Sequence, residues 1–155
     1  MRLIILTSTF LLLFQTANCQ TLESKSGAFP TNIDSASFHL LKKYHGDIIA
    51  FDGQIKEIKN SRNNTPFYKL DLGDNRILWT ALMFQNDVNK INESIRVVGY
   101  LRKTNDKRPE EKFLNDYKFM VLAFGLVDFK NSNFLFLSGA DMQKKEWMDG
   151  KIPSQ

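Results

Sequence analysis

Cysteine and histidine are almost missing from this chain of 155 residues, which contains one Cys and two His. A catalytic nucleophile with its base, or a metal site, needs Cys, His, Asp or Glu side chains that converge. The two histidines, His39 and His45, belong to no HExxH pattern, and the chain has no CxxC pair and no glycine-rich phosphate loop. We therefore expect no catalytic residues, no metal ion, no cofactor and no enzymatic activity.

Long apolar runs are also missing, apart from residues 3–14 near the N-terminus. That run is too short to cross a hydrocarbon core of ~30 Å, which needs roughly 20 apolar residues. A positive Met1-Arg2 precedes it and the polar residues 15–19 follow it, which is the layout of an export signal. We expect residues 1–19 to be a signal peptide.

The only cysteine, Cys19, ends the predicted signal, and two processing routes are open there. Signal peptidase I prefers small residues near the cut, so cleavage after Cys19 would use Ala17 and leave Gln20 at the N-terminus. In the bacterial lipoprotein route, the Cys19 thiol is acylated and becomes the first residue. Thr16 and Asn18 depart from the usual lipobox, whereas the position of the cysteine fits it. Both routes predict an exported protein, and the second adds a membrane anchor at Cys19.

Disulfides are excluded within a chain that has a single cysteine. Small domains of exported animal proteins usually depend on disulfides. Their absence therefore favours a bacterial envelope protein that its core alone stabilises. We expect it in the periplasm or at the outer membrane.

A strong excess of one charge is missing too. Removal of Arg2 with the signal leaves 20 basic and 17 acidic residues, a net charge of +3. Nucleic-acid binders usually concentrate their charge in a stripe or patch, whereas here Lys and Arg are interleaved with Asp and Glu. The charge gives only weak support to an anionic partner.

What remains is enough sequence for one domain with its own core. Residues 20–45 predict a flexible polar leader that ends in a short helix, with Phe38, Leu41 and Tyr44 at helical spacing and Gly46 placed to end it. Residues 46–138 alternate in the manner of strands and are expected to form a β-barrel. Residues 139–155 predict a helical tail.

Strand patterns occur five times in the barrel region, and a sixth short strand is placed to pair back as a hairpin. They fall at residues 47–58, 67–72, 76–83, 95–103, 119–129 and 134–137. In the first strand, Phe51 and Ile55 share one phase and Ile58 falls in the other, which predicts a bulge after Gly53 in a bent strand. The predicted fold class is mainly β: a five-stranded closed barrel with short flanking helices.

Short motifs in these strands resemble a known family. Residues 53–58 (GQIKEI), 70–74 (LDLGD) and 97–99 (VVG) match patterns that recur in OB-folds, in particular in the nucleic-acid-binding type of the tRNA-anticodon and helicase class. The resemblance covers roughly residues 46–103 and implies an OB-like barrel with a ligand-binding outer face. The chain departs from the simplest pattern of that class in its charged insert at residues 104–118, and the helix expected between the third and fourth strands is short.

The outer barrel face contains the candidate binding residues. If Leu70 and Leu72 point inward, one curved face interleaves aromatic rings with cations, and OB-folds use such a face together with two loops to bind oligonucleotides or oligosaccharides. The candidate ligand-binding residues are Arg62, Phe67, Lys69, Arg76, Arg96, Tyr100 and Arg102. The same pattern is also typical of an ordinary solvated face, with Phe67 covered by the tail.

The same alternation assigns the remaining large side chains. Leu78 and Thr80 share the predicted outward phase, whereas Trp79 is expected in the core. Trp147, in the predicted tail helix, is expected to pack onto the barrel.

Three functional hypotheses follow. The favoured one is an exported, membrane-tethered OB-fold binding or adaptor module without catalytic activity, whose partner is an envelope protein or a small polymer. The first alternative is a binder of single-stranded nucleic acid or another anionic polymer. The mild charge of the protein and its expected location outside the cytoplasm count against that alternative. The second is a structural component of an envelope complex.

Overall fold

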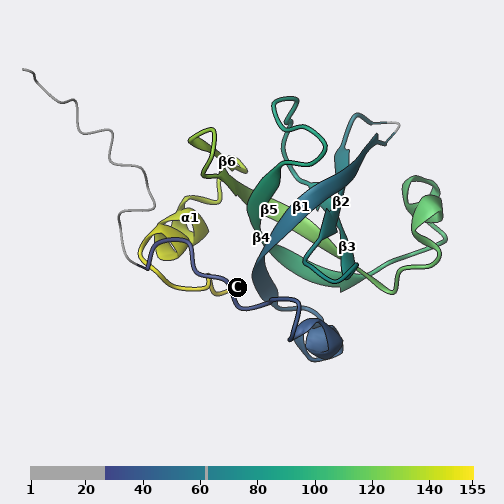
Figure 1. The fold of residues 1–155 in the computed structure, drawn as a ribbon, viewed down its shortest axis with the longest axis horizontal. Helices are drawn as coiled ribbons and strands as arrows, with labels where there is room; N and C mark the ends of the chain where they lie inside the picture. Colours follow the sequence, from purple (N-terminus) through teal and green to yellow (C-terminus); the bar gives the residue numbers. More distant parts are fainter. Residues whose placement is uncertain (1–26, 62) are drawn as a thin grey trace, which may run out of the picture.

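A computed structural model of the chain describes residues 27–61 and 63–155. The predicted signal peptide, Cys19 and Arg62 lie outside the described residues. A six-stranded sheet, ordered β3-β2-β1-β4-β5-β6, dominates the fold (Figure 1). Its strands are β1 (Ile48–Asn60), β2 (Pro66–Asp71), β3 (Ile77–Leu82), β4 (Ser94–Lys103), β5 (Phe119–Asp128) and β6 (Asn133–Phe136). Short helices flank the sheet: the 3-10 helices η2 (Phe38–Tyr44) and η3 (Pro109–Leu114), and the α-helix α1 (Asp141–Met148).

The first five strands close into a barrel because β1 has two partners and β3 meets β5. Residues 48–54 of β1 pair with β4, and residues 54–60 pair with β2. The β3–β5 pairing is parallel, whereas the other pairings are antiparallel. The predicted fold class is confirmed: a mainly β, closed five-stranded barrel with short helices around it, compatible with an OB-like fold.

Two irregularities shape the barrel wall. The register of β1 with β2 slips between Ile55 and Glu57, and both Ile55 and Ile58 pack on the interior, as the predicted bulge requires. A second slip lies in the β4–β5 ladder next to Gly99. A Cβ at that position would stand 2.3 Å from the carbonyl oxygen of Leu122, so only glycine fits where these strands approach closely.

The barrel interior is apolar and fully closed to solvent. Its buried members are Ile49, Phe51, Ile55, Tyr68, Leu70, Leu78, Leu82, Ile95, Val97, Leu101, Val121, Ala123 and Leu126. Burial, with smaller contributions from the charges of Glu93 and Asp87, raises the pKa of Tyr68 to about 12. The phenol of Tyr68 therefore stays neutral at physiological pH.

The orientation of β3 is the opposite of the predicted one. Leu78 and Thr80, expected to face outward, are buried on the inner side, at 1% and 0% exposure. Trp79, expected in the barrel core, lies in a separate outer cluster with Phe67 and Ala81. Both faces of β3 are buried, and a strand buried on both faces has no apolar–polar alternation from which to choose the inward phase.

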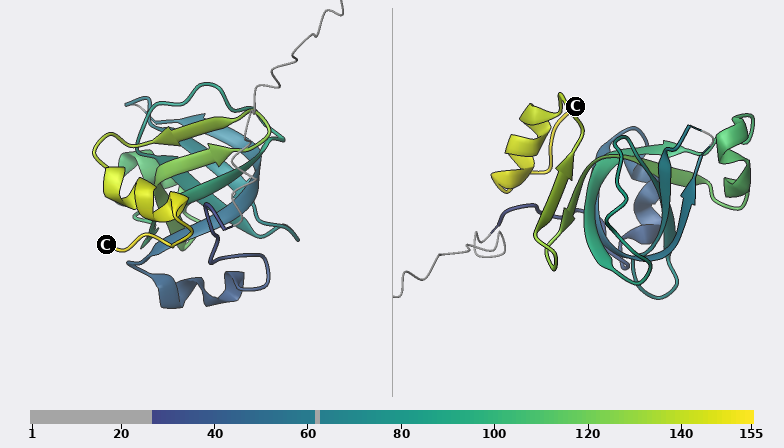
Figure 2. Two further views of the ribbon diagram at one scale, coloured as in Figure 1. Left: turned by 90° about the vertical axis from the view of Figure 1, so that its left-hand side faces the viewer. Right: turned by 90° about the horizontal axis from the view of Figure 1, so that it is seen from above.

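Two segments cover the outside of the barrel on opposite sides (Figure 2). On one side, α1, β6 and residues 28–29 pack around Trp147, which is fully buried. Its indole N–H donates a hydrogen bond of 2.8 Å to the carbonyl oxygen of Pro30. The prediction that Trp147 packs on the barrel is confirmed. On the other side, η3 of the insert lies over β2 and β3.

The end of the barrel is closed by a helix that precedes β1. In η2, Leu41 is buried, and Phe38 and Tyr44 pack against the interior cluster. The described connection between β3 and β4, residues 83–93, contains turns and no helix. This end of the barrel is therefore covered by η2, which precedes β1, and not by a helix between β3 and β4.

Candidate ligand-binding site

The aromatic part of the predicted outer face is covered by the insert. Phe67 points outward, as expected, yet it is only 4% exposed. The ring of Phe113, in η3, packs edge-on against Phe67 with centroids 5.3 Å apart, and against Trp79 at 5.0 Å. The ammonium group of Lys59 lies 4.8 Å from the centre of the Phe113 ring. OB-folds bind ligands on the β2–β3 face, so in this chain the insert, and not the tail, occupies that face.

Arg96 is held by groups of its own chain. Its guanidinium donates two hydrogen bonds to the Asp52 carboxylate, at 2.7 and 2.8 Å, and a third to the carbonyl oxygen of Phe29 at 2.9 Å. The same group lies 5.0 Å from the ring centre of Phe129. These contacts use the planar fork of arginine fully. Arg96 therefore fastens residues 28–29 to the barrel wall.

Arg102 is paired with a buried carboxylate of the insert. It donates a hydrogen bond to Glu111, which is 2% exposed and also lies 3.5 Å from Arg108. Burial alone would raise the pKa of Glu111, but the hydrogen bonds from Arg102 and the Asn105 amide, together with the two arginine charges, lower it below its ordinary value. Glu111 is therefore ionised, and its bond to Arg102 ties η3 to β4.

The other predicted binding residues in the described part of the chain also contact groups of the same chain. Arg76 donates to the carbonyl oxygen of Ser35 and lies 3.7 Å from Asp74. Lys69 lies 3.9 Å from a carboxylate oxygen of Glu57, and the half-buried ring of Tyr100 packs against Phe124 at 5.3 Å. The predicted residues that the structure describes thus lie on several parts of the barrel wall, and most of them contact groups of the same chain.

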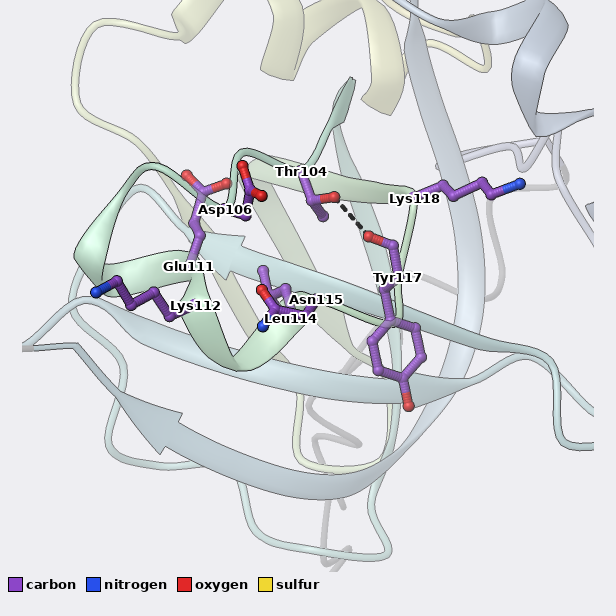
Figure 3. A pocket seen from close by; sticks show the side chains of 8 residues that line it. All are labelled: Thr104, Asp106, Glu111, Lys112, Leu114, Asn115, Tyr117 and Lys118. Atoms are coloured by element: carbon purple, nitrogen blue, oxygen red, sulfur yellow. Dashed lines mark hydrogen bonds between the residues drawn. The ribbon is translucent and has the colours of Figure 1, made fainter.

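The insert borders an open polar hollow of about 450 Å³, and Glu111 is among the residues that line it (Figure 3). The Thr104 hydroxyl donates a hydrogen bond to the carbonyl oxygen of Tyr117, which joins the two ends of the insert. Lys112 and Lys118 extend from the insert in opposite directions (Figure 3). Lys118 also borders a second and larger hollow.

That larger hollow opens where the parallel β3–β5 seam begins. The ladder starts with Trp79 opposite Met120, so the residues just before it are not paired across the seam. Here η2, the β2–β3 turn and the end of the insert leave a cleft of about 540 Å³. This seam cleft is lined by Phe38, His39, Leu41, Lys42, Asn75, Arg76, Ile77, Leu78, Asp116, Tyr117, Lys118 and Phe119.

Lysines without ionic partners surround the seam cleft. Lys42 and Lys118 line it, and an adjoining hollow of about 400 Å³ shares both and adds Lys103. Within the part of the chain that the structure describes, no ion pair includes any of the three. These lysines are not among the binding residues predicted from the sequence. Pairing of the predicted strands 95–103 and 119–129 would have placed Lys103 beside Lys118, whereas nothing in the sequence links Lys42 to them.

A buried polar network at the opposite end of β5 has a structural role. Asn89, 4% exposed, donates hydrogen bonds to Asp128 at 2.9 Å and to Glu93 at 3.2 Å. Asn131 donates to the same Asp128 carboxylate at 2.7 Å. The network joins the β3–β4 connection to the β5–β6 turn, and it satisfies the buried carboxylate without a ligand.

Residues 27–61 and 63–155 contain no group of three or more His, Cys, Asp or Glu side chains arranged to hold a metal ion. None of the helices described is long and apolar enough to cross a membrane.

No known family model matches the chain, and no curated protein matches it in sequence.

Proposed function

We propose that the protein is an exported OB-like binding module, tethered to an envelope membrane through Cys19, that binds its partner without catalysing a reaction. The export signal and the position of Cys19 support the location. The seam cleft carries the binding part of the proposal. It is an apolar hollow within the 300–1,000 Å³ range of known ligand sites, with a few polar groups at its border.

The nucleic-acid-binding OB type is the weaker candidate. Its support is the set of motifs at residues 53–58, 70–74 and 97–99. Against it, Phe67 is covered by Phe113, and Arg96 and Arg102 donate to carboxylates of the same chain. A strand of nucleic acid needs exposed rings for stacking and free cations along its backbone. The covered and paired residues offer neither.

Cell fractionation of the full chain and a Cys19→Ala variant tests the location. We expect the wild-type chain in the membrane fraction, labelled by a fatty-acid analogue added to the culture. The variant should lose the label and move to the soluble envelope fraction. A variant that remains in the membrane without label would show that Cys19 is not the anchor.

Native purification of the full chain from detergent-solubilised envelope tests binding. The tagged protein should retain a reproducible partner or small ligand that a tagged unrelated lipoprotein does not retain. Recovery of the tagged chain alone, with no bound protein or small molecule detected by mass spectrometry, would contradict the proposal.

A further inference from the structure

The floor of the seam cleft is apolar because it reaches into the barrel itself. Leu78 of β3 and Leu41 of η2 are 1% and 5% exposed, and both belong to the interior cluster. Ile77 and Phe119, which flank the start of the β3–β5 ladder, are only partly buried. A ligand over the partly exposed Phe38, Ile77 and Phe119 would remove apolar area from water without any change in the barrel.

The charge around this floor is positive. Three cations line the cleft, Lys42, Arg76 and Lys118, against one carboxylate, Asp116. Arg76 is already engaged by Asp74 and Ser35, whereas Lys42 and Lys118 are exposed and make no ion pair among the described residues. The two free ammonium groups come from η2 and from the end of the insert, so they border the cleft on two sides. An anionic group in the cleft could contact both.

We infer that the seam cleft binds a small organic anion, with one carboxylate, phosphate or sulfonate group on an apolar or aromatic body. The apolar floor takes the body, and Lys42 and Lys118 take the charged group. The volume of about 540 Å³ suits a small molecule. The inference rests on the proposed binding function and adds the chemical class of the ligand.

The test uses residues 20–155, which lack the predicted signal and the lipid-bearing Cys19, and 8-anilinonaphthalene-1-sulfonate, a fluorescent probe with one sulfonate on an aromatic body. We expect saturable binding at one site. A Lys42→Gln/Lys118→Gln double variant should bind the probe about fivefold more weakly, since two exposed ionic contacts are lost. The control, Lys90→Gln/Lys151→Gln, changes two exposed lysines elsewhere and should bind as the wild type does.

Displacement of the probe by competing ligands separates the contribution of charge to affinity from the contribution of apolar burial. Octanoate should displace the probe at much lower concentration than octanol, which has the same chain length and no charge. Added salt should weaken octanoate more than octanol, because salt screens exposed charges. Unchanged affinity in the Lys42/Lys118 variant, or equal displacement by octanoate and octanol, would overturn the inference.

These outcomes are distinguishable from failure of the proposed function. The probe experiment needs neither the anchor nor a native partner. If the envelope purification yields a partner and the probe does not bind at Lys42 and Lys118, the ligand class is wrong and the binding module stands. If no partner or ligand is found in either experiment, both are wrong.

Discussion

The cations of the barrel wall and those of the barrel end differ in what they contact. On the wall, Arg96 donates to Asp52, and Arg102 donates to Glu111. At the end, Lys42 and Lys118 line the seam cleft, and Lys103 lines the adjoining hollow. None of the three has an ionic partner among residues 27–61 and 63–155. The wall uses its charges to hold chain segments together.

This difference predicts that substitutions in the two regions will affect different properties, stability on the wall and binding at the end. Removal of one member of a buried ion pair leaves the other charge without its partner, and the folded state loses free energy. Removal of an exposed, unpaired lysine changes stability little. We therefore expect substitutions on the wall to lower stability and substitutions at the end to lower affinity for an anion.

The largest effect is expected for Glu111→Gln. The substitution keeps the shape of the side chain but leaves Arg102 beside a neutral amide, in a place where Glu111 is 2% exposed. The free energy of unfolding should fall by about 2 kcal/mol in urea titrations. The control is Glu110→Gln at the exposed neighbouring residue, which should change the free energy of unfolding by less than about 0.5 kcal/mol. Equal effects of the two substitutions would mean that the pair does not stabilise the insert.

The same pair predicts a pH dependence. The pKa of Glu111 is lowered from 4.5 in the folded protein: burial opposes ionisation, and the Arg102 hydrogen bond, the Asn105 amide and the charges of Arg102 and Arg108 outweigh it. A carboxyl with a lowered folded pKa contributes stability above its unfolded pKa and loses it as the pH falls through the folded one. Urea titrations from about pH 7 down to about pH 3 should show a steeper loss for wild type than for Glu111→Gln. Parallel curves would contradict the assignment.

A smaller effect is expected for Arg96→Ala. The substitution removes the paired hydrogen bonds to Asp52, the bond to the Phe29 carbonyl and the contact with the Phe129 ring. Because Asp52 is largely exposed, the loss should be about 1 kcal/mol. Hydrogen exchange should speed up in residues 27–33, while binding of the anionic probe stays unchanged.

The conservative variant Arg96→Lys refines this test. It keeps the charge and loses the planar fork, so it should recover only part of the stability. Full recovery would mean that the charge alone, rather than the geometry of the contacts, fastens the N-terminal segment.

Much of the barrel could be predicted because polar residues alternate with apolar ones over part of β1, β2 and β4. This alternation indicates the inward phase, and the slip between Ile55 and Ile58 indicates the bulge. The predicted orientation was wrong at β3, where Leu78 is buried on the inner face and Trp79 on the outer face. The insert covers the outer face of β3, so apolar residues are buried on both faces of this strand.

The seam cleft could not be predicted for a different reason. Periodicity tells which face of a strand a residue occupies, but not where two strands stop pairing. The parallel ladder begins at Trp79 and Met120, and η2 comes from a distant part of the chain to border the gap. Strand phase, together with the mixture of cations and aromatic rings, placed Arg96 and Arg102 on the candidate face. Their partners, Asp52 and Glu111, come from other segments, so only the three-dimensional contacts show that these arginines are engaged.

The smallest effect on stability is expected for the Lys42→Gln/Lys118→Gln variant. Neither lysine has a carboxylate partner among the residues that the structure describes, so the free energy of unfolding should change by less than about 0.5 kcal/mol. Because the substitutions remove the repulsion between two like charges, any change in the free energy of unfolding at low salt should be an increase. Added salt should remove this increase, because it screens the charges. Thermal and urea unfolding in low and high salt measure this. A loss above about 1 kcal/mol would show that the two lysines stabilise the fold. The barrel end would then resemble the wall, and a weaker affinity of the variant for anions would no longer identify a ligand contact.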